Sequence, residues 1–257
     1  MSNLMEVRNL VKKFGGLTAV NNFSMHVSEN EMLGLIGPNG AGKTTVLNLV
    51  SSFLTLNAGE IIFDGHNITK LSSAQKAERG VVRTFQVNNL FRKMTVMENI
   101  LAGIYNRTDQ GFWTSILPFS SGKCSSFVKE EAESIIEDMS LTQFRDTQAG
   151  SLPHGFQRLL GIGLALTTRP KLLLLDEPFT GMIAEESQLL ISIIRKARTQ
   201  NISLVMVEHN MKAVMELCDR ITVLNFGTKI AEGLPHEIQN NPEVIEAYLG
   251  ADQGEIE

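Results

Sequence analysis

Apolar residues occur in two patterns that predict strands. Residues 23–27 alternate strictly between apolar and polar side chains, and together with residues 5–10 they predict short strands of an antiparallel sheet broken by turns. Residues 32–36, 172–175 and 202–207 are almost continuously apolar, as expected of strands buried on both faces of a parallel sheet. Further strands are predicted at residues 60–63, 80–85, 221–224 and 229–231.

Four other segments have apolar residues at helical spacing. The first begins at Thr95, which can form a capping box with Glu98. Residues 105–126 have no clear period and predict a variable insertion, and two short helices near the end include one opened by Pro242. The alternation of helices with buried strands predicts an α/β fold with a mostly parallel sheet. The four helices are expected at residues 95–104, 127–139, 156–166 and 184–198.

One motif with every required position filled lies between the predicted buried strand at residues 32–36 and a further predicted helix at residues 45–50, which has helical apolar spacing. It fits Gly-x-x-x-x-Gly-Lys-[Ser/Thr], in which backbone N–H groups and a helix N-terminus surround a phosphate. Lys43 would bridge the β- and γ-phosphates, and the Thr44 hydroxyl would be a Mg²⁺ ligand. A chance glycine-rich turn is the alternative. The loop comprises Gly37, Pro38, Asn39, Gly40, Ala41, Gly42, Lys43, Thr44 and Thr45.

Polar residues follow three other predicted strands at their carboxyl ends, where such sheets place ligand-binding groups. Asp176 can hold Mg²⁺ through its water shell, and Glu177 can orient or deprotonate the water that attacks the γ-phosphate. His209 can hydrogen-bond the γ-phosphate. Gln86 directly follows the carboxyl end of the predicted strand at 80–85. The alternatives are a solvated acidic cap and a structural histidine.

Phe14 precedes two glycines and is a candidate to lie flat against a nucleotide base, although an aromatic residue in this position is more often a packing residue.

Composition excludes several classes of protein. The 257 residues carry a net charge of −5, so no basic field favours nucleic acid as the main partner. Cys124 and Cys218 have neither metal-ligand spacing nor a repeated pattern, which favours two unpaired thiols in a reducing compartment. No apolar run approaches the ~20 residues that a membrane-spanning helix needs. A chain that is neither secreted nor membrane-spanning is expected.

Taken in order, these motifs resemble those of ATP-binding-cassette (ABC) ATPase subunits. Phe14, the phosphate loop, Gln86, a Leu-x-x-Gly element at 152–155, Leu-Leu-Asp-Glu-Pro at 174–178 and His209 follow the order of that family over essentially the whole chain. Four segments are similar to the ATPase subunit of bacterial branched-chain amino-acid importers, although the lipopolysaccharide-export ATPase has a similar tail. These segments are residues 14–16, 80–86, 90–99 and 241–250.

The resemblance implies a single ABC ATPase domain over residues 1–257, with a phosphate-loop NTPase core, an N-terminal antiparallel β part and a helical subdomain. The core would comprise residues 1–86 and 168–235. The helical subdomain, with its signature element, would cover residues 87–167, and residues 236–257 would form a helical tail.

The resemblance also implies roles for particular residues, with ATP and Mg²⁺ as cofactors. Phe14 would stack on adenine, and Gln86 would touch Mg²⁺ and sense the membrane partner. Leu152 and Gly155 would reach the ATP of a second subunit. The family signature is Leu-Ser-Gly-Gly-Gln, whereas residues 152–156 read Leu-Pro-His-Gly-Phe, and Ile183 stands where Asp or Asn is usual.

These observations predict an ATP-hydrolysing importer subunit for branched-chain amino acids, at the cytoplasmic face of the bacterial inner membrane. Its expected partners are a second, non-identical ATPase subunit, membrane permease subunits and a separate solute-binding protein, with no nucleic acid. The alternatives are a lipopolysaccharide-export ATPase and a degenerate regulatory subunit that binds ATP. A DNA-repair or translation ATPase of the same superfamily would be expected to show a second cassette, a coiled coil or a basic surface.

Overall fold

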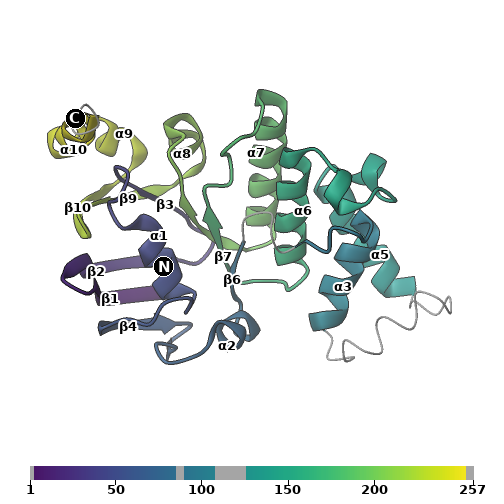
Figure 1. Ribbon diagram of the computed structural model, residues 1–257, viewed down its shortest axis with the longest axis horizontal. Coiled ribbons are helices and arrows are strands. Elements are labelled where there is room, and N and C mark those ends of the chain that lie inside the picture. The colour runs from purple at the N-terminus through teal and green to yellow at the C-terminus, as the bar shows by residue number, and fades with distance from the viewer. Residues whose placement is uncertain (1–2, 85–89, 108–125, 253–257) are drawn as a thin grey trace. The chain divides into compact units, whose positions relative to one another are not determined.

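The computed structural model describes residues 3–84, 90–107 and 126–252 (Figure 1). Gln86 and most of the predicted insertion at 105–126, including Cys124, lie outside the described residues. The chain divides into two compact units. The first comprises residues 1–83, 171–178 and 198–257, and the second comprises residues 84–170 and 179–197.

The first unit begins with an antiparallel sheet, as predicted from the alternating start of the chain. Its four strands are arranged in the order β2-β1-β4-β5. β1 and β2 extend well beyond the predicted segments, and the two strands stay paired through their polar ends despite several register shifts. Asp64 and Gly65 both have positive φ values, of 49° and 73°, and form the tight turn expected after the strand at 60–63. The strands are β1 (Asn3–Phe14), β2 (Leu17–Ser28), β4 (Ala58–Phe63) and β5 (His66–Asn67).

A second sheet in the same unit has the order β10-β9-β3-β8-β7-β6. Its strands pair in parallel, except that β10 is antiparallel to β9. Every residue of β3 and β8 is buried, which accounts for their continuous apolar sequences. The strands are β3 (Met32–Ile36), β6 (Val81–Arg83), β7 (Leu172–Asp176), β8 (Ser203–Val207), β9 (Arg220–Asn225) and β10 (Thr228–Gly233).

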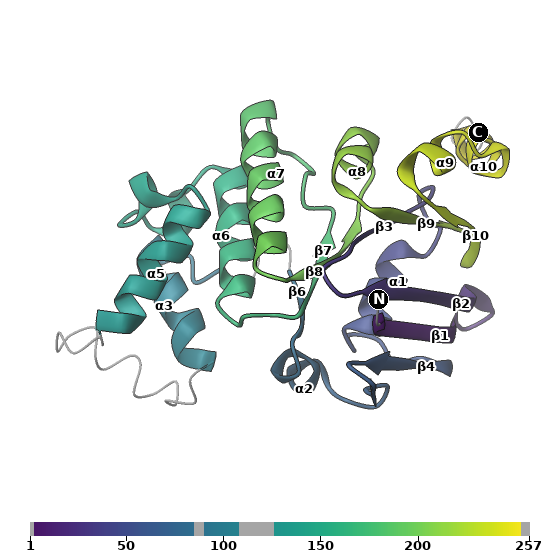
Figure 2. The same ribbon diagram turned by 180° about the vertical axis from the view of Figure 1, so that it is seen from behind.

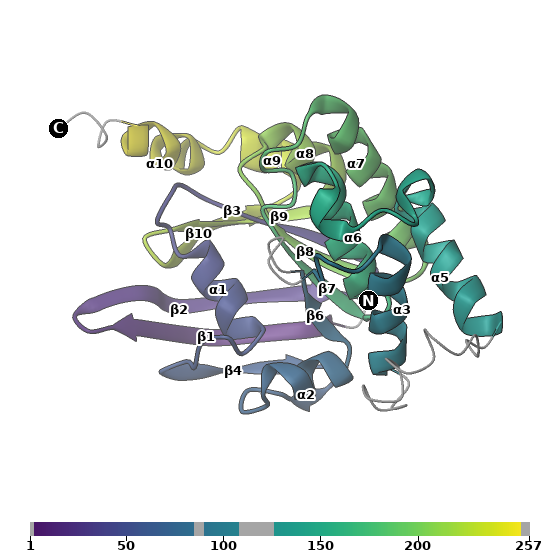
Figure 3. The same ribbon diagram turned by 45° about the vertical axis from the view of Figure 1, so that its right-hand side comes forward.

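Helix α1 (Lys43–Val50) follows β3 and contributes to a core shared by both sheets. Figure 3 shows this helix beside β1 and β2. Its buried side chains Val46, Leu47 and Val50 belong to one apolar cluster that also takes in residues of β1, β3, β7 and β8. This packing fixes the helix that begins at the predicted phosphate loop.

The short helix α2 (Ser73–Glu78) was not predicted and carries a buried lysine. A capping box between Ser72 and Gln75 begins the helix. The ammonium group of Lys76, only 1% exposed, donates a hydrogen bond of 2.7 Å to the carbonyl oxygen of Val50 at the end of α1. Burial lowers the pKa of Lys76 from 10.5 to about 8.

The second unit is built mainly from helices, which Figure 2 shows from behind. All four helices predicted by apolar spacing are present, with ends shifted by a few residues. α6 starts before the predicted Phe156, because Pro153 occupies the N-cap position with φ of −53° and ψ of 151°. The helices are α3 (Val96–Arg107), α5 (Ser126–Asp138), α6 (His154–Leu166) and most of α7 (Ala184–Thr199).

The first unit ends with helices α8 (Met211–Leu217), α9 (Pro235–Gln239) and α10 (Pro242–Asp252). The two terminal helices were predicted, including the start of α10 at Pro242, whereas α8 was not. Within the described ranges, no helix has both the length and the apolar character needed to cross a bilayer.

Candidate functional site

The loop between β3 and α1 has a backbone that glycine alone permits at two positions. A Cβ atom at Gly37, where φ is 149°, would lie 2.0 Å from the carbonyl oxygen of Leu224. At Gly42, where φ is 103°, it would lie 2.6 Å from the carbonyl oxygen of Ala19. Both contacts are with backbone and cannot be relieved by a side-chain movement, so the glycines of the motif are needed for the loop to form.

The lysine of the motif points into its own loop. Lys43 is 5% exposed, and its Nζ atom donates hydrogen bonds to the carbonyl oxygens of Gly37 and Pro38 at 2.7 and 2.8 Å. Burial lowers the pKa of Lys43, and the carboxylates of Glu177 and Asp176 oppose that shift. A positive charge therefore lies inside the loop, where an anionic phosphate would offset the cost of its burial.

The N-terminus of α1 is also suited to an anion. Gly42 occupies the N-cap position and provides no side-chain cap, and the first turn contains no acidic residue. The first N–H groups of a helix need partners from outside it, and the helix dipole favours negative charge there. Thr44 lies exposed in this turn, and Thr45 is half-buried.

The predicted acidic residues Asp176 and Glu177 lie at the end of β7, which is separated from β3 by one strand, β8. Asp176 ends β7 and is paired in register with Val207 of β8, while the N–H group of Glu177 donates to the Val207 carbonyl oxygen at 2.8 Å. Glu177 has a φ of 47°, a left-handed conformation that is uncommon for a residue with a side chain. Such strain occurs frequently at functional sites.

The structure brings His209 and Glu177 together. Nε2 of the histidine lies 2.9 Å from Oε1 of the glutamate, and both side chains are partly exposed. Glu208, only 2% exposed, holds the turn: its Oε2 accepts hydrogen bonds from the N–H groups of His209 and Asn210 at 2.8 and 3.0 Å. Asn210 in turn caps α8. The strand-end position predicted for His209 is confirmed, whereas nothing in the sequence indicated that Glu208 orders this turn.

A further charged residue at this edge was not predicted. Nη2 of Arg83, at the end of β6, lies 2.7 Å from Oδ2 of Asp176. Arg83 also reaches α1, where its Nη1 lies 2.5 Å from Oδ1 of Asn48. The sequence feature that could have indicated Arg83 is that it is the one charged residue in an otherwise mainly apolar predicted strand, at residues 80–85.

The candidate base-stacking residue lies at the end of β1 and pairs with Leu17 across the turn. Phe14 is 45% exposed, and the ammonium group of Lys12 lies 4.9 Å from its ring centroid. Its exposed ring is available for stacking, and its role stays a prediction.

The predicted signature residues lie in the second unit. Leu152 is buried at 4% exposure, and Gly155 is buried in the first turn of α6. A Cβ atom at Gly155 would lie 2.1 Å from the carboxylate of Glu186, a buried residue on α7 whose Oε2 accepts a hydrogen bond from the Ile183 N–H at 3.2 Å. A side chain at this position would therefore require the Glu186 carboxylate to move from its place beside the Ile183 N–H group.

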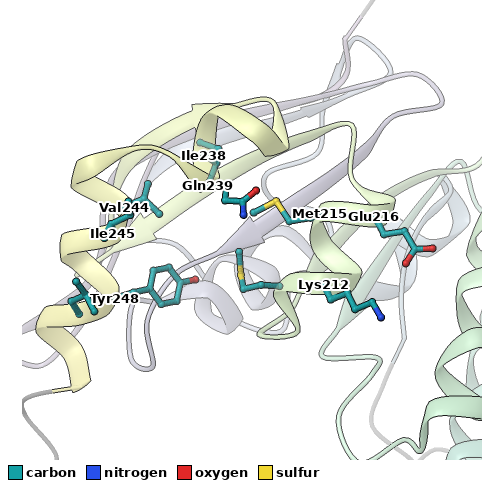
Figure 4. A pocket seen from close by; sticks show the side chains of 10 residues that line it. Lys212, Met215, Glu216, Ile238, Gln239, Val244, Ile245 and Tyr248 are labelled. Carbon is teal, nitrogen blue, oxygen red and sulfur yellow. The ribbon is translucent and has the colours of Figure 1, made fainter.

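Helix α8 and the two terminal helices of the first unit line an open, mainly apolar pocket of about 730 Å³, and its lining includes none of the predicted site residues (Figure 4). Tyr248 points into it from α10. Burial raises the pKa of this tyrosine, while a hydrogen bond with the Gly37 backbone partly opposes the shift, so the tail reaches the phosphate loop. The pocket is lined by Met211, Lys212, Met215, Glu216, Ile238, Gln239, Val244, Ile245, Tyr248 and Leu249.

A glycine-restricted loop, a buried lysine and acid and histidine groups at the same sheet edge define a nucleotide-binding ATPase of the phosphate-loop class. The chain belongs to the ABC transporter family, which matches residues 20–180. Residues 228–253 match a second family, described as branched-chain amino acid ATP-binding cassette transporter.

Curated relatives cover nearly the whole chain. The high-affinity branched-chain amino acid transport ATP-binding protein BraF of Pseudomonas aeruginosa is 40% identical over 254 residues, covering 96% of this chain and 98% of BraF. LivG of Escherichia coli, which has the same description, is 41% identical over 249 residues with the same coverage. The lipopolysaccharide export system ATP-binding protein LptB of Haemophilus influenzae is 32% identical over 248 residues, again covering 96% and 98%.

Solved structures show the same fold. An ATP-binding cassette of an ABC transporter in its ADP conformation superposes with a TM-score of 0.84 at 30% identity, covering 97% of this chain and 100% of that one. A nucleotide-free cassette gives a TM-score of 0.81 at 31% identity, covering 96% and 98%. The predicted fold class, an α/β ABC ATPase with an antiparallel part, is confirmed.

Proposed function

We propose that this chain is the ATP-hydrolysing subunit of a branched-chain amino-acid importer at the cytoplasmic face of the bacterial inner membrane. The observation that carries the proposal is the convergence of the Lys43 loop, Asp176 and the Glu177–His209 pair at one edge of one sheet. The match of residues 228–253 and the names of the 40–41% identical relatives support the solute class.

The residues present fit Mg²⁺. Oδ1 of Asp176 is buried without a hydrogen-bond partner, whereas Oδ2 is engaged by Arg83. A buried carboxylate oxygen without a partner is costly, and a hydrated cation would satisfy it. Among the described residues, no three His, Cys, Asp or Glu side chains could hold a metal by themselves, which suits a cation held by one carboxylate, the Thr44 hydroxyl and substrate phosphates. Bound Mg²⁺ would neutralise charge on the transferred phosphate.

Hydrolysis would rely on Glu177 as the base. Its carboxylate would orient the attacking water and accept a proton from it as the bond between the water oxygen and the γ-phosphorus forms. The bond between that phosphorus and the β–γ bridging oxygen breaks in the same reaction, and the products are ADP and phosphate. The Nε2 atom of His209, 2.9 Å from this carboxylate, would give up its hydrogen bond with Glu177 and donate to the γ-phosphate when ATP is bound. Lys43 would exchange its contacts with the loop carbonyls for the β- and γ-phosphates. Phe14 would stack on adenine, and Gln86 would sense the membrane partner.

The chain would act in a dimer with a non-identical ATPase subunit. Leu152 and Gly155 would complete the ATP site of that subunit, where Pro153 has no hydroxyl or N–H group to donate. The N–H groups at the start of α6, which has no side-chain cap, would partly compensate. The site that uses Glu177 should therefore carry more of the turnover than the site completed by this altered signature.

The permease subunits would contact the second unit near Phe91, which is 46% exposed. Asn99, fully buried, holds this segment: it accepts a hydrogen bond from the Phe91 N–H at 2.9 Å and donates to the carbonyl oxygens of Phe91 and Thr95. The neighbouring Leu90 is buried and belongs to the core of the unit, so Phe91 is the better anchor.

The central test is Glu177→Gln in the assembled transporter. The amide keeps the shape but loses basicity, so ATP binding should persist while hydrolysis and transport of leucine, isoleucine and valine collapse. If the Glu177→Gln variant hydrolysed ATP at the wild-type rate, the assignment of Glu177 as the catalytic base would be refuted. If the unaltered complex binds ATP but neither Glu177→Gln nor the equivalent change in the partner affects its low turnover, the chain is the regulatory alternative that its altered signature favours.

The solute class and the dimer asymmetry need separate readouts. An active complex that moves lipopolysaccharide and no amino acid would favour the LptB-like alternative. For the asymmetry, Glu177→Gln is compared with the equivalent change in the partner subunit. If both changes reduced ATP turnover equally, or if the partner's change reduced it more, the site that uses Glu177 would not carry the larger share of turnover and the assigned asymmetry would be wrong.

A further inference from the structure

Arg83 forms a buried ion pair with the carboxylate proposed to serve Mg²⁺. β6 and β7 are neighbouring parallel strands, and the Arg83 and Asp176 side chains are 10% and 11% exposed. Nη2 lies 2.7 Å from Oδ2. Charged groups at this depth hold one arrangement, because breaking the pair would leave an uncompensated charge away from water.

The guanidinium is also fixed on its other side. Nη1 lies 2.5 Å from Oδ1 of Asn48, and the guanidinium carbon lies 5.7 Å from the ring centroid of Phe53. Asn48 belongs to α1, the helix that begins at the phosphate loop. Arg83 therefore connects the end of β7 to the element that positions the phosphates, using the planar fork that lysine lacks.

The pairing makes the two oxygens of Asp176 unequal. Oδ2 is engaged by Arg83, whereas Oδ1 is buried with no hydrogen-bond partner. We infer that Arg83 is a positioning residue for the Mg²⁺ site: it holds Oδ2 so that Oδ1 is the oxygen presented to the hydrated cation. The inference rests on the proposed function, in which Asp176 serves Mg²⁺.

The test measures metal-dependent nucleotide binding without turnover. A non-hydrolysable ATP analogue is titrated calorimetrically into the purified chain, once with Mg²⁺ and once with EDTA, and the ratio of the two Kd values gives the enhancement by the metal. Arg83→Met should lower this ratio by about 10-fold or more, the usual effect of removing a group that orients a metal ligand. Binding in EDTA should stay within about twofold, since the lysine and glycines of the loop are unchanged.

Companion variants separate positioning from general damage. Arg83→Lys keeps the charge without the fork and should give an intermediate ratio. In an Asp176→Asn background, Arg83→Met should have no further effect on the ratio, since the oxygen that it orients has been altered. Arg220→Met is the matched control, because Arg220 forms ion pairs with Glu31 and Glu232 in the same unit and its side chain is 17% exposed.

The outcomes are distinct. If Arg83→Met weakens binding equally with and without Mg²⁺, or if Arg220→Met lowers the ratio as much, Arg83 has only a structural role and the inference is wrong. If Asp176→Asn itself leaves the ratio unchanged, the proposed Mg²⁺ role of Asp176 fails first. Should Arg83→Met not fold, Asn48→Ala removes only one of the tethers. It should lower the ratio in the same direction, and an unchanged ratio would overturn the inference.

Discussion

The buried ammonium group of Lys76 should make the stability of the first unit depend on pH. Its pKa is about 8 in the folded protein and 10.5 when exposed, a difference that corresponds to ~3 kcal/mol. Between these values, the unfolded chain retains a proton that the folded chain has lost, and stability rises with pH wherever the unfolded state binds more protons. Lys76 should therefore add ~3 kcal/mol to the free energy of unfolding between pH 8 and pH 10.5.

Lys76→Met removes this titration. At pH 7 the change has two opposing effects: it removes the cost of burying a charge, and it leaves the Val50 carbonyl oxygen without the ammonium donor. The difference between the two proteins across pH is the cleaner quantity, because every other titrating group is shared.

The assay is urea unfolding followed by circular dichroism at pH 7 and pH 10.5. Relative to wild type, Lys76→Met should lose ~3 kcal/mol of stability as the pH rises. Lys70→Met, which alters an exposed lysine of the same unit, is the matched control and should follow the wild type. If the free energies of unfolding of wild type and Lys76→Met changed in parallel with pH, burial would not lower the pKa of Lys76 as described.

Three further predictions concern the loop, the signature and a thiol. Lys43→Ala should weaken ATP binding at least 10-fold by calorimetry, since it removes the cation inside the loop; unchanged affinity would contradict its role. Gly155→Ala should reduce stability by ~1–3 kcal/mol through the carboxylate of Glu186, and Gly155→Ala combined with Glu186→Ala should recover part of the loss. Burial raises the pKa of Cys218 to about 12, so in a Cys124→Ser background iodoacetamide at pH 8 should label it only in urea, and rapid native labelling would disprove this.

Much of the fold and site followed from local sequence patterns. The phosphate loop was predictable because the whole motif lies in one short segment, although the backbone contacts that require Gly37 and Gly42 come from the distant residues Leu224 and Ala19. Asp176, Glu177 and His209 could be placed at one edge because parallel strands end together, although His209 lies far along the chain from the two acids. The meeting of His209 with Glu177 also requires β7 and β8 to be neighbours, which the structure shows and these patterns do not.

Other features depend on contacts that a single segment does not reveal. The pairing of Arg83 with Asp176 requires β6 and β7 to be neighbours, and the sequence does not state which strands are adjacent. The polar extensions of β1 and β2 are stabilised by backbone pairing, which apolar alternation cannot detect. The helices α2 and α8 are too short to show a helical period clearly, and they are fixed by their caps at Ser72 and Asn210.

The left-handed backbone at Glu177 implies a trade between folding and catalysis. A non-glycine residue in this conformation costs ~1 kcal/mol or more, and the cost falls on the residue that would activate water. Glycine at position 177 should relieve that strain and so stabilise the folded state, although the greater conformational freedom of glycine in the unfolded chain opposes this gain. The same change should abolish ATP turnover. Selection for folding alone would not favour glutamate here, so the native sequence retains a locally unfavourable residue at the position where its carboxylate is proposed to activate water.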